Sequence, residues 1–189
     1  MFRKLYELYL TKEAACIYAN YNDTGKFHFG KIVAVNESEV AIQTVTPDGE
    51  MDGIVVIGID CINRVETNSQ YVEKMKKLCY EESFLLSKLQ IGNKHIAKNV
   101  LLQAFKDNYA VSIELMNSGQ NDVVGIVKCI DDTVCSVEQY DEYGFIDGEA
   151  YFLLRDITKI AVLSQDEKII MRLIERNQAK KTGDGLRKP

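Results

Sequence analysis

The residue types that most often carry catalysis or hold metals are few in this chain and lie far apart. Its 189 residues include only two histidines, His28 and His95, and neither has a second ligand candidate at the spacing that zinc sites use. The sequence has no G-x-S-x-G motif and no phosphate-binding loop. The acidic pairs Asp131-Asp132 and Asp141-Glu142 stand at turn positions, where acidic residues are expected anyway. We therefore expect a protein that is not an enzyme, has no metal and no cofactor, and acts on no small-molecule substrate.

The cysteines do not change this expectation. They are odd in number, have no C-x-x-C spacing and mostly lie in apolar stretches: Cys16, Cys61, Cys79, Cys129 and Cys135. Buried free thiols are favoured over a redox or metal role.

Composition bears on compartment and partners. No apolar run approaches the roughly 20 residues that a membrane span needs, and the first residues lead into an amphipathic segment rather than a signal-peptide core. We therefore expect a cytoplasmic protein with no membrane partner. The formal net charge of −5 does not favour a polyanion as a partner of the whole surface, so a site for nucleic acid would have to be local.

The chain repeats itself, without gaps, at an offset of 95 residues. Corresponding residues include Gly30 with Gly125, Ile62 with Ile157, Ser69-Gln70 with Ser164-Gln165, and Leu78 with Leu173. This period is longer than that of solenoid repeats or propeller blades, so each unit should be a complete small domain. Each half would be marginally stable alone, which makes contact between halves, or with another subunit, a source of extra stability.

The pattern of apolar residues predicts the same elements in both halves. A short helix comes first, at 2–10 and at 100–105, and five short strands with period-two alternation follow it. Turn residues such as Asn22-Asp23-Thr24-Gly25 and Asn117-Ser118-Gly119 separate the strands. The predicted strands are 16–19, 27–35, 39–45, 53–59 and 62–67 in the first half, and 111–115, 123–130, 133–140, 149–154 and 157–163 in the second.

A second helix is expected after each fifth strand. Ser164-Gln165-Asp166-Glu167 has the capping-box pattern. The first-half helix starts at Ser69, and its apolar pattern continues to Leu89 before Ile91-Gly92 breaks it. This organisation predicts one domain at 1–90, a second at 91–176, and a disordered polar tail at 177–189.

Each half resembles the Sm-like family of small, SH3-like barrels. The resemblance rests on a helix followed by five short strands, with a glycine in the second strand and an acidic turn six residues later, as in Gly125 to Asp131. In the first half Gly30 is kept and Asn36 stands at the acidic position. The resemblance covers roughly 1–68 and 98–163. It implies a mainly β protein made of two tandem five-stranded, bent antiparallel barrels with flanking helices.

The sequence departs from the family at the positions that bind RNA. Sm-like proteins hold a uracil between an aromatic or histidine side chain and an arginine, and an asparagine reads the base edge. The corresponding positions hold Ser38 and Val40 in the first half, and Thr133 and Cys135 in the second. None of these side chains stacks on or reads a base in that way. The usual uridine pocket is therefore not expected.

A Gly-x-x-Asp-Gly motif also occurs in both halves. It comprises Gly49, Asp52 and Gly53, and then Gly144, Asp147 and Gly148. We interpret it mainly as turn chemistry, in which the aspartate satisfies turn amides and a glycine takes positive φ, rather than as a ligand-binding loop.

Two functions from different classes follow from the resemblance. The first is an interaction or scaffold protein, because Sm-like barrels associate through their fourth and fifth strands, giving self-association or binding of another protein. The alternative is an Sm-like RNA-binding protein that uses another surface. The residues expected at such an RNA or partner surface are Tyr140, Tyr143, Lys128, Arg155 and Lys159.

Overall fold

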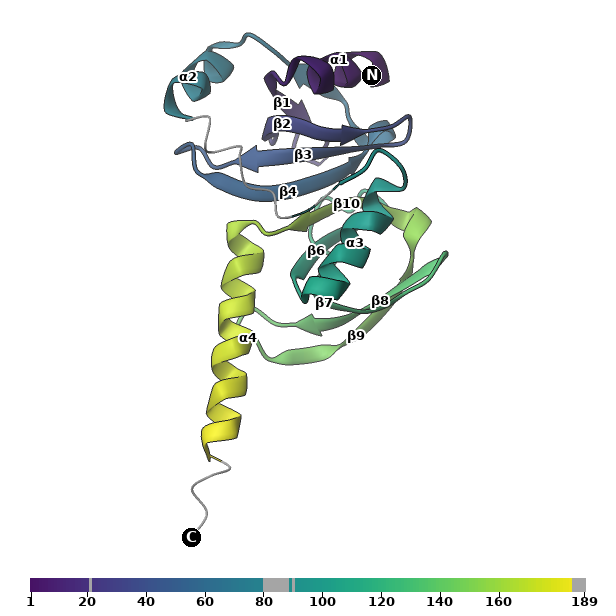
Figure 1. Cartoon of the computed structure of the whole chain (residues 1–189), viewed down its shortest axis with the longest axis vertical. Helices are drawn as coiled ribbons and strands as arrows, with labels where there is room; N and C mark the ends of the chain where they lie inside the picture. Colours follow the sequence, from purple (N-terminus) through teal and green to yellow (C-terminus); the bar gives the residue numbers. More distant parts are fainter. Residues whose placement is uncertain (21, 80–88, 90, 185–189) are drawn as a thin grey trace.

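The computed structural model describes residues 1–20, 22–79, 89 and 91–184 (Figure 1). The first half contains α1 (Phe2–Thr11), β1 (Ala14–Tyr18), β2 (His28–Val35), β3 (Glu39–Val45), β4 (Met51–Gly58), the 3-10 turn η1 (Ile59–Cys61), β5 (Arg64–Glu66) and α2 (Gln70–Leu78). The second half contains α3 (Ile96–Asp107), β6 (Ala110–Leu115), β7 (Val123–Ile130), β8 (Val134–Tyr140), β9 (Ile146–Leu153), η3 (Leu154–Asp156), β10 (Ile157–Val162) and α4 (Gln165–Asp184).

The prediction of a mainly β protein with flanking helices is confirmed. All strand pairs are antiparallel, and the strands form one open sheet in the order β5-β1-β2-β3-β4-β10-β6-β7-β8-β9. The sheet bends so that the two halves lie one above the other, with β4 and β10 where they meet (Figure 1).

The structure does not show the predicted pair of separate barrels. The outer edge of β4 pairs with β10 of the other half, while β5 pairs with β1 at one end of the sheet. Because β4 finds its hydrogen-bonding partner across the halves, the sheet continues from one half into the other.

Within this sheet the two halves pair their strands in closely related ways. The second, third and fourth strands of each half have the same register at the offset of 95 residues, including the positions of their bulges. Corresponding pairs are Gly30–Thr44 and Gly125–Gln139, Ala34–Ala41 and Cys129–Ser136, and Glu39–Gly58 and Val134–Leu153. The first hairpin differs by one residue, because Gly30 faces Ala15 whereas Gly125 faces Val111.

The largest apolar core crosses the boundary between the halves. It unites Ile54 and Val56 of β4 with Ile160 and Val162 of β10, and extends under α3 through Val100 and its neighbours. A second core lies in the first half, where Leu5 and Leu8 of α1 pack on the sheet. Burial of the β4 and β10 side chains in a shared core ties the halves together through the hydrophobic effect.

The ends of the two helices α2 and α4 differ from those predicted. The helix α4 continues to Asp184, so the prediction of a disordered tail from residue 177 is wrong for residues 177–184. Asn177 lies on this extension, and its side-chain amide donates to the carbonyls of Tyr143 and Gly144 at 3.0 and 3.1 Å. The first-half helix α2 ends at Leu78, where Cys79 is extended, so the predicted continuation of this helix does not begin there. Residues 84 and 85 of that continuation, and the last residues of the tail, lie outside the described residues.

The glycines at the strand bends give a stability prediction. A Cβ at Gly125 would lie 2.0 Å from the backbone oxygen of Glu138, and a Cβ at Gly30 would lie 2.0 Å from that of Gln43. We expect Gly125→Val to lower the free energy of unfolding by about 1–3 kcal/mol or more, because the backbone must move to admit the side chain. Thermal and urea unfolding measure this loss, and Gly92→Ala, at a site with no atom within 4 Å, is the control. Equal unfolding curves for both variants would contradict the close strand crossing.

Candidate functional site at the junction of the two halves

The junction between β4 and β10 is the place where the two halves act on one another. Its paired residues are Ile54–Val162, Val55–Ala161, Val56–Ile160 and Ile57–Lys159. In terms of the repeat, the fourth strand of the first half pairs with the fifth strand of the second. Most of these side chains are buried, and the exceptions are Lys159 and Ala161, which are half-buried.

The start of β4 makes a further contact with the second half. A carboxylate oxygen of Asp52 accepts a hydrogen bond of 2.9 Å from the backbone N–H of Gln165, the first residue of α4. Acidic groups at a helix N-terminus satisfy a free N–H and interact favourably with the helix dipole. Beside it Gly53, with φ of +82°, lies so close to Val162 and Leu163 that a Cβ would be 2.4 Å from the Val162 oxygen.

The equivalent residues of the second half have no neighbouring segment of the described chain packed against them. Asp147 and Gly148 are exposed on β9, and a Cβ at Gly148 would meet no atom within 4 Å. Gly148 has φ of +94°, a positive value close to the +82° of Gly53. The second half therefore presents the same strand geometry as the first, without a neighbour in the described chain on that side.

Within the part of the chain that the structure describes, two sheet edges therefore have no partner strand. β9 pairs with β8 and forms one end of the sheet, and β5 pairs with β1 and forms the other. These are a fourth and a fifth strand, the same two kinds of strand that meet at the junction. Tyr151 and Ile146 on β9 are 69% and 62% exposed, whereas their counterparts Val56 and Met51 on β4 are buried and half-buried.

The Gly-x-x-Asp-Gly motifs have the backbone geometry of turns, but their aspartates have another role. Gly49, Gly53, Gly144 and Gly148 all have positive φ. The turn amides bond elsewhere: the carboxylate of Asp141 accepts from the N–H groups of Tyr143 and Phe145. Asp52 instead reaches α4, so the expectation that the motif's aspartates satisfy turn amides is wrong for Asp52.

The residues predicted for an RNA or partner surface do not all lie on one open face. Tyr140 is buried, and its hydroxyl donates to Glu138 at 2.6 Å, while Lys128 pairs with the same carboxylate at 3.4 Å. Burial and the hydrogen bond to Glu138 raise the pKa of Tyr140 to about 12. The ring of Tyr140 is thus unavailable for stacking.

The other three predicted residues have different surroundings. Tyr143 is exposed in the β8–β9 turn, and Arg155 is exposed in η3, where it lies 3.7 Å from Asp156. Lys159 lies at the junction, where it pairs with Glu114. Among the predicted residues, only Tyr140 and Lys128 are joined by a shared partner.

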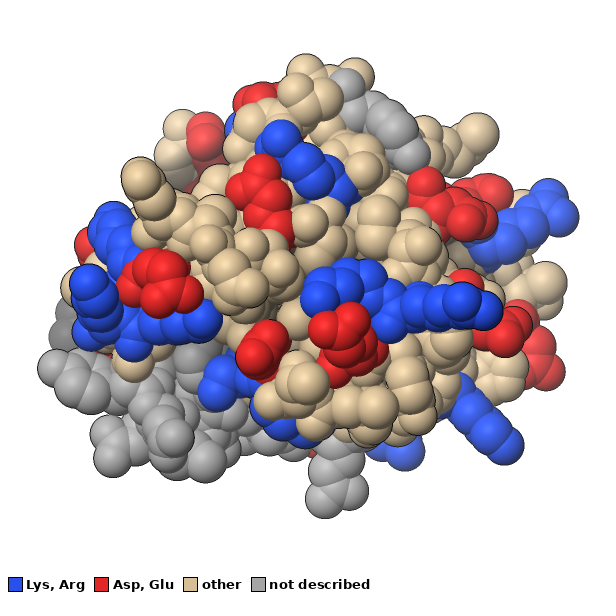
Figure 2. All heavy atoms as spheres, turned by 90° about the horizontal axis from the view of Figure 1, so that it is seen from above, with Lys and Arg blue, Asp and Glu red and all other residues tan. Residues whose placement is uncertain are grey.

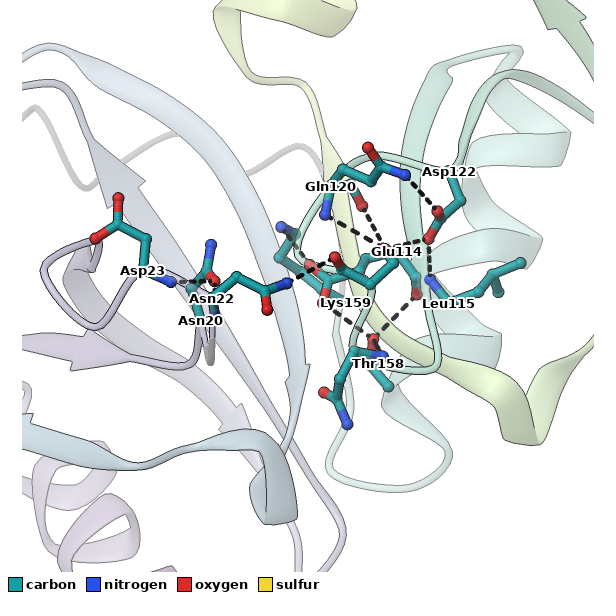
Figure 3. A network of polar contacts seen from close by, with 11 residues as sticks. Asn20, Asn22, Asp23, Glu114, Leu115, Gln120, Asp122, Thr158 and Lys159 are labelled. Atoms are coloured by element: carbon teal, nitrogen blue, oxygen red, sulfur yellow. Dashed lines mark hydrogen bonds and ion pairs between the residues drawn. The ribbon is translucent and has the colours of Figure 1, made fainter.

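A cavity of about 450 Å³ lies beside the junction. The β1–β2 loop forms one wall, the β6–β7 loop forms the other, and residues of β4 and β10 lie between them. The amide of Asn22 donates to the carbonyl of Ser118 at 2.8 Å and so links the two loops (Figure 3). Lining residues include Asn20, Lys26, His28, Gln120, Thr158 and Lys159.

A nearly buried ion pair lies in this cavity. The ammonium of Lys159 is 2.8 Å from the carboxylate of Glu114, and these side chains are 21% and 8% exposed. The hydroxyl of Thr158 bonds to the carbonyl of Glu114 at 3.3 Å on the neighbouring strand (Figure 3). Removing two charges from water is costly, so this pair is weak evidence for stability and calls for another explanation.

His28 lines the same cavity and lies close enough to Lys159 to be affected by its charge. Burial, together with the positive charge of Lys159, lowers the pKa of His28 from 6.5 to about 4. The imidazole is therefore neutral at pH 7, with one nitrogen able to donate and the other able to accept. No group in the described part of the chain forms a hydrogen bond with it. Cys61 also lines the cavity, and burial followed by the charge of Glu114 raises the pKa of its thiol.

The sequence alone did not bring these groups together. His28 is separated by 131 positions from Lys159, and Glu114 lies on a third strand. Each appears by itself as a polar residue in an alternating strand. The one signal is that all three differ from their counterparts in the repeat, which are Val123, Arg64 and Ala19.

Comparison with protein-family models, curated proteins and solved structures found no match to this chain. Within the described residues, no helix is both long enough and apolar enough to cross a membrane. The same residues contain no group of three or more histidine, cysteine, aspartate or glutamate side chains that could hold a metal ion.

The shifted histidine gives a pH prediction. Between pH 6.5 and about 4 the unfolded chain binds a proton at His28 that the folded chain does not, so the stability that neutral His28 contributes is lost as pH falls through this range. His28→Val, which places the residue of position 123 here, removes this dependence. We expect the melting temperature of wild type to fall relative to that of the variant between pH 7 and pH 4.5. A constant difference between the two melting temperatures would contradict the assignment.

Proposed function

We propose that this protein is a non-enzymatic, Sm-like interaction protein that assembles with further copies of itself through its sheet edges. One observation carries the proposal: the chain already contains one fourth-strand to fifth-strand contact, β4 with β10, and leaves one strand of each kind open at the ends of the sheet. A second copy of the chain would supply the missing partner for each open edge.

The Sm-like assignment and the duplication of an ancestral domain are part of this proposal. The sheet order, taken half by half, is fifth, first, second, third and fourth strand, twice over. The shared register of strands two to four at a constant offset supports descent of both halves from one unit. A bent strand that lacks a side chain at its crossing, as at Gly30 and Gly125, supports a barrel-like curvature in each half.

The internal junction gives the register of the intermolecular one. Shifting the β4–β10 pairs by 95 residues aligns Phe152 with Arg64, Tyr151 with Val65, and Ala150 with Glu66 of the next copy. In the same way, the Asp52–Gln165 hydrogen bond corresponds to one in which Asp147 accepts from the N–H of Gln70 at the start of α2 of the next copy. The contact is head to tail, so copies add in one direction and form a ring where the rotation closes.

Several properties of the open edges suit this partner. An uncapped strand edge presents a row of free backbone donors and acceptors, and proteins usually cover or blunt such edges. β9 has eight residues and carries exposed Tyr151 and Ile146. The counterpart β5 has only three residues, so backbone pairing is short and the side chains around it must contribute to affinity.

RNA binding by an Sm-like ribonucleoprotein component remains the alternative. Exposed Tyr143 and Tyr151 offer aromatic rings for stacking. Against it, Tyr140 is buried, and acidic and basic side chains alternate over the face seen from the end formed by the first half (Figure 2). Purified protein that retains nucleic acid in a salt-dependent way would favour this alternative over self-assembly.

Substitution of the two aspartates of the repeat distinguishes an effect on folding from an effect on assembly. We expect Asp52→Ala to lower the free energy of unfolding by about 0.5–2 kcal/mol, because it removes an acceptor at the α4 N-terminus. Asp147→Ala should leave the unfolding of the single chain unchanged and weaken assembly roughly fivefold. Thermal melts and concentration-dependent sedimentation measure the two effects. Sedimentation of both variants identical to wild type would argue against the proposed contact.

A disulfide tests the proposed register directly. In a Cys129→Ser background, Val65→Cys combined with Tyr151→Cys should give covalent oligomers on mild oxidation, because facing residues of antiparallel strands lie within disulfide reach. Val65→Cys combined with Ala150→Cys is the control, since position 150 faces the other side of the strand. Equal cross-linking of the two variants, or none in either, would contradict the proposed pairing.

A further inference from the structure

The cavity beside the junction is not needed for pairing of the sheet edges. Its volume of about 450 Å³ lies within the roughly 300–1,000 Å³ of small-molecule sites. Its walls come from both halves, and the bond from Asn22 to Ser118 holds the two loops together. A neutral histidine and a nearly buried ion pair face into it, which is the combination of a formed cavity and converging polar groups that marks ligand sites.

Three side chains that line the cavity, those of Lys159, Lys26 and Asn20, offer hydrogen-bond donors to a ligand. Lys159 uses one ammonium N–H for Glu114 and keeps two, and Lys26 has only a distant partner, Asp23 at 3.9 Å. The side-chain oxygen of Asn20 already accepts from the N–H groups of Asn22 and Asp23, so its amide nitrogen is the group directed elsewhere. A ligand that satisfies these groups must be rich in acceptors.

The formal charge of the lining residues also favours a ligand rich in acceptors, because it favours an anion. Lys26 and Lys159 carry two positive charges against the one negative charge of Glu114 among the lining residues. Glu114 is the more deeply buried member of its pair, at 8% exposure against 21% for Lys159, so the ammonium is the more accessible charge. A surplus positive charge in a partly enclosed space favours an anion.

The positions related by the repeat do not reproduce this chemistry. The second half has Val123 in place of His28. In place of the Glu114–Lys159 pair the first half has Tyr18 opposite Arg64, with the guanidinium 3.7 Å from the centre of the tyrosine ring. Most of the strand register is nevertheless retained between the halves. The polar lining is therefore specific to the internal junction and is not demanded by the fold of each half.

We propose that this cavity binds the phosphate group of a small phosphorylated molecule, with Lys159 and Lys26 as its cationic partners and His28 and Asn20 as further hydrogen-bond donors. Phosphate combines negative charge with several acceptor oxygens, and lysine commonly binds it as a point charge. The volume exceeds what inorganic phosphate fills, which leaves space for an attached sugar-sized group.

Titration with inorganic phosphate and with ribose 5-phosphate, followed by calorimetry or NMR on the full chain, tests the proposal. We expect saturable binding of both, with ribose 5-phosphate the tighter ligand. Single-stranded RNA without terminal phosphates is the third probe, and it should compete weakly. Absence of saturable binding by the two phosphates would overturn the proposal, and RNA binding as tight as that of ribose 5-phosphate would transfer the site to the RNA-binding alternative.

Variants identify the cavity as the binding location. Lys26→Ala changes an exposed side chain and should weaken ribose 5-phosphate several-fold with no change in melting temperature, and Lys159→Met should weaken it about tenfold or more. Glu114→Gln should tighten it, because a negative charge is lost. Lys128→Met, which removes a lysine paired with Glu138, is the control and should have no effect. Equal weakening by Lys128→Met and Lys26→Ala, or weaker binding by Glu114→Gln, would overturn the assignment.

Discussion

The structure depends on the pairing of β4 with β10. This contact satisfies the backbone groups of two strands that would otherwise be edges, and it places Val56 beside Ile160 in a core that belongs to both halves. Small domains bury too little apolar surface to be very stable alone, so sharing a core adds the stability that each half lacks. The same contact positions the loops that enclose the cavity, because β10 carries Lys159 to the side of β4.

The contact also makes two related halves unequal. Gly53 and Gly148 have similar positive φ values, yet one is enclosed by the other half and the other is open. Asp52 accepts from the first turn of α4, while Asp147 stays exposed. A head-to-tail contact between two units necessarily leaves one unused surface of each kind, which is why the open edges of this chain complement one another in type.

Local features of the fold could be predicted from the sequence, whereas the long-range pairing could not. Strand positions followed from alternation and turn residues, and β3 and β7 have the predicted bounds. The capping pattern at Ser164 led correctly to a helix, where Glu167 accepts from the Ser164 N–H at 3.0 Å. Nothing local indicated that β4 would pair with β10 rather than close a barrel, because an apolar strand edge suits either partner. For the same reason the cavity, assembled from residues on three strands far apart in the chain, had no sequence signature.

The ion pair is informative because the related positions of the first half hold a different pair. Where the second half has Glu114, a carboxylate buried against Lys159, the first half has Tyr18 opposite Arg64, whose guanidinium lies 3.7 Å from the centre of the Tyr18 ring. Such a pair recovers its desolvation cost only with good geometry and often contributes no net stability. The position holds an uncharged aromatic residue in the first half, so the strand pairing alone does not require a carboxylate there. A charged pair beside a neutral histidine in a cavity therefore agrees better with the ligand-binding role proposed for this cavity than with a role in the stability of the sheet.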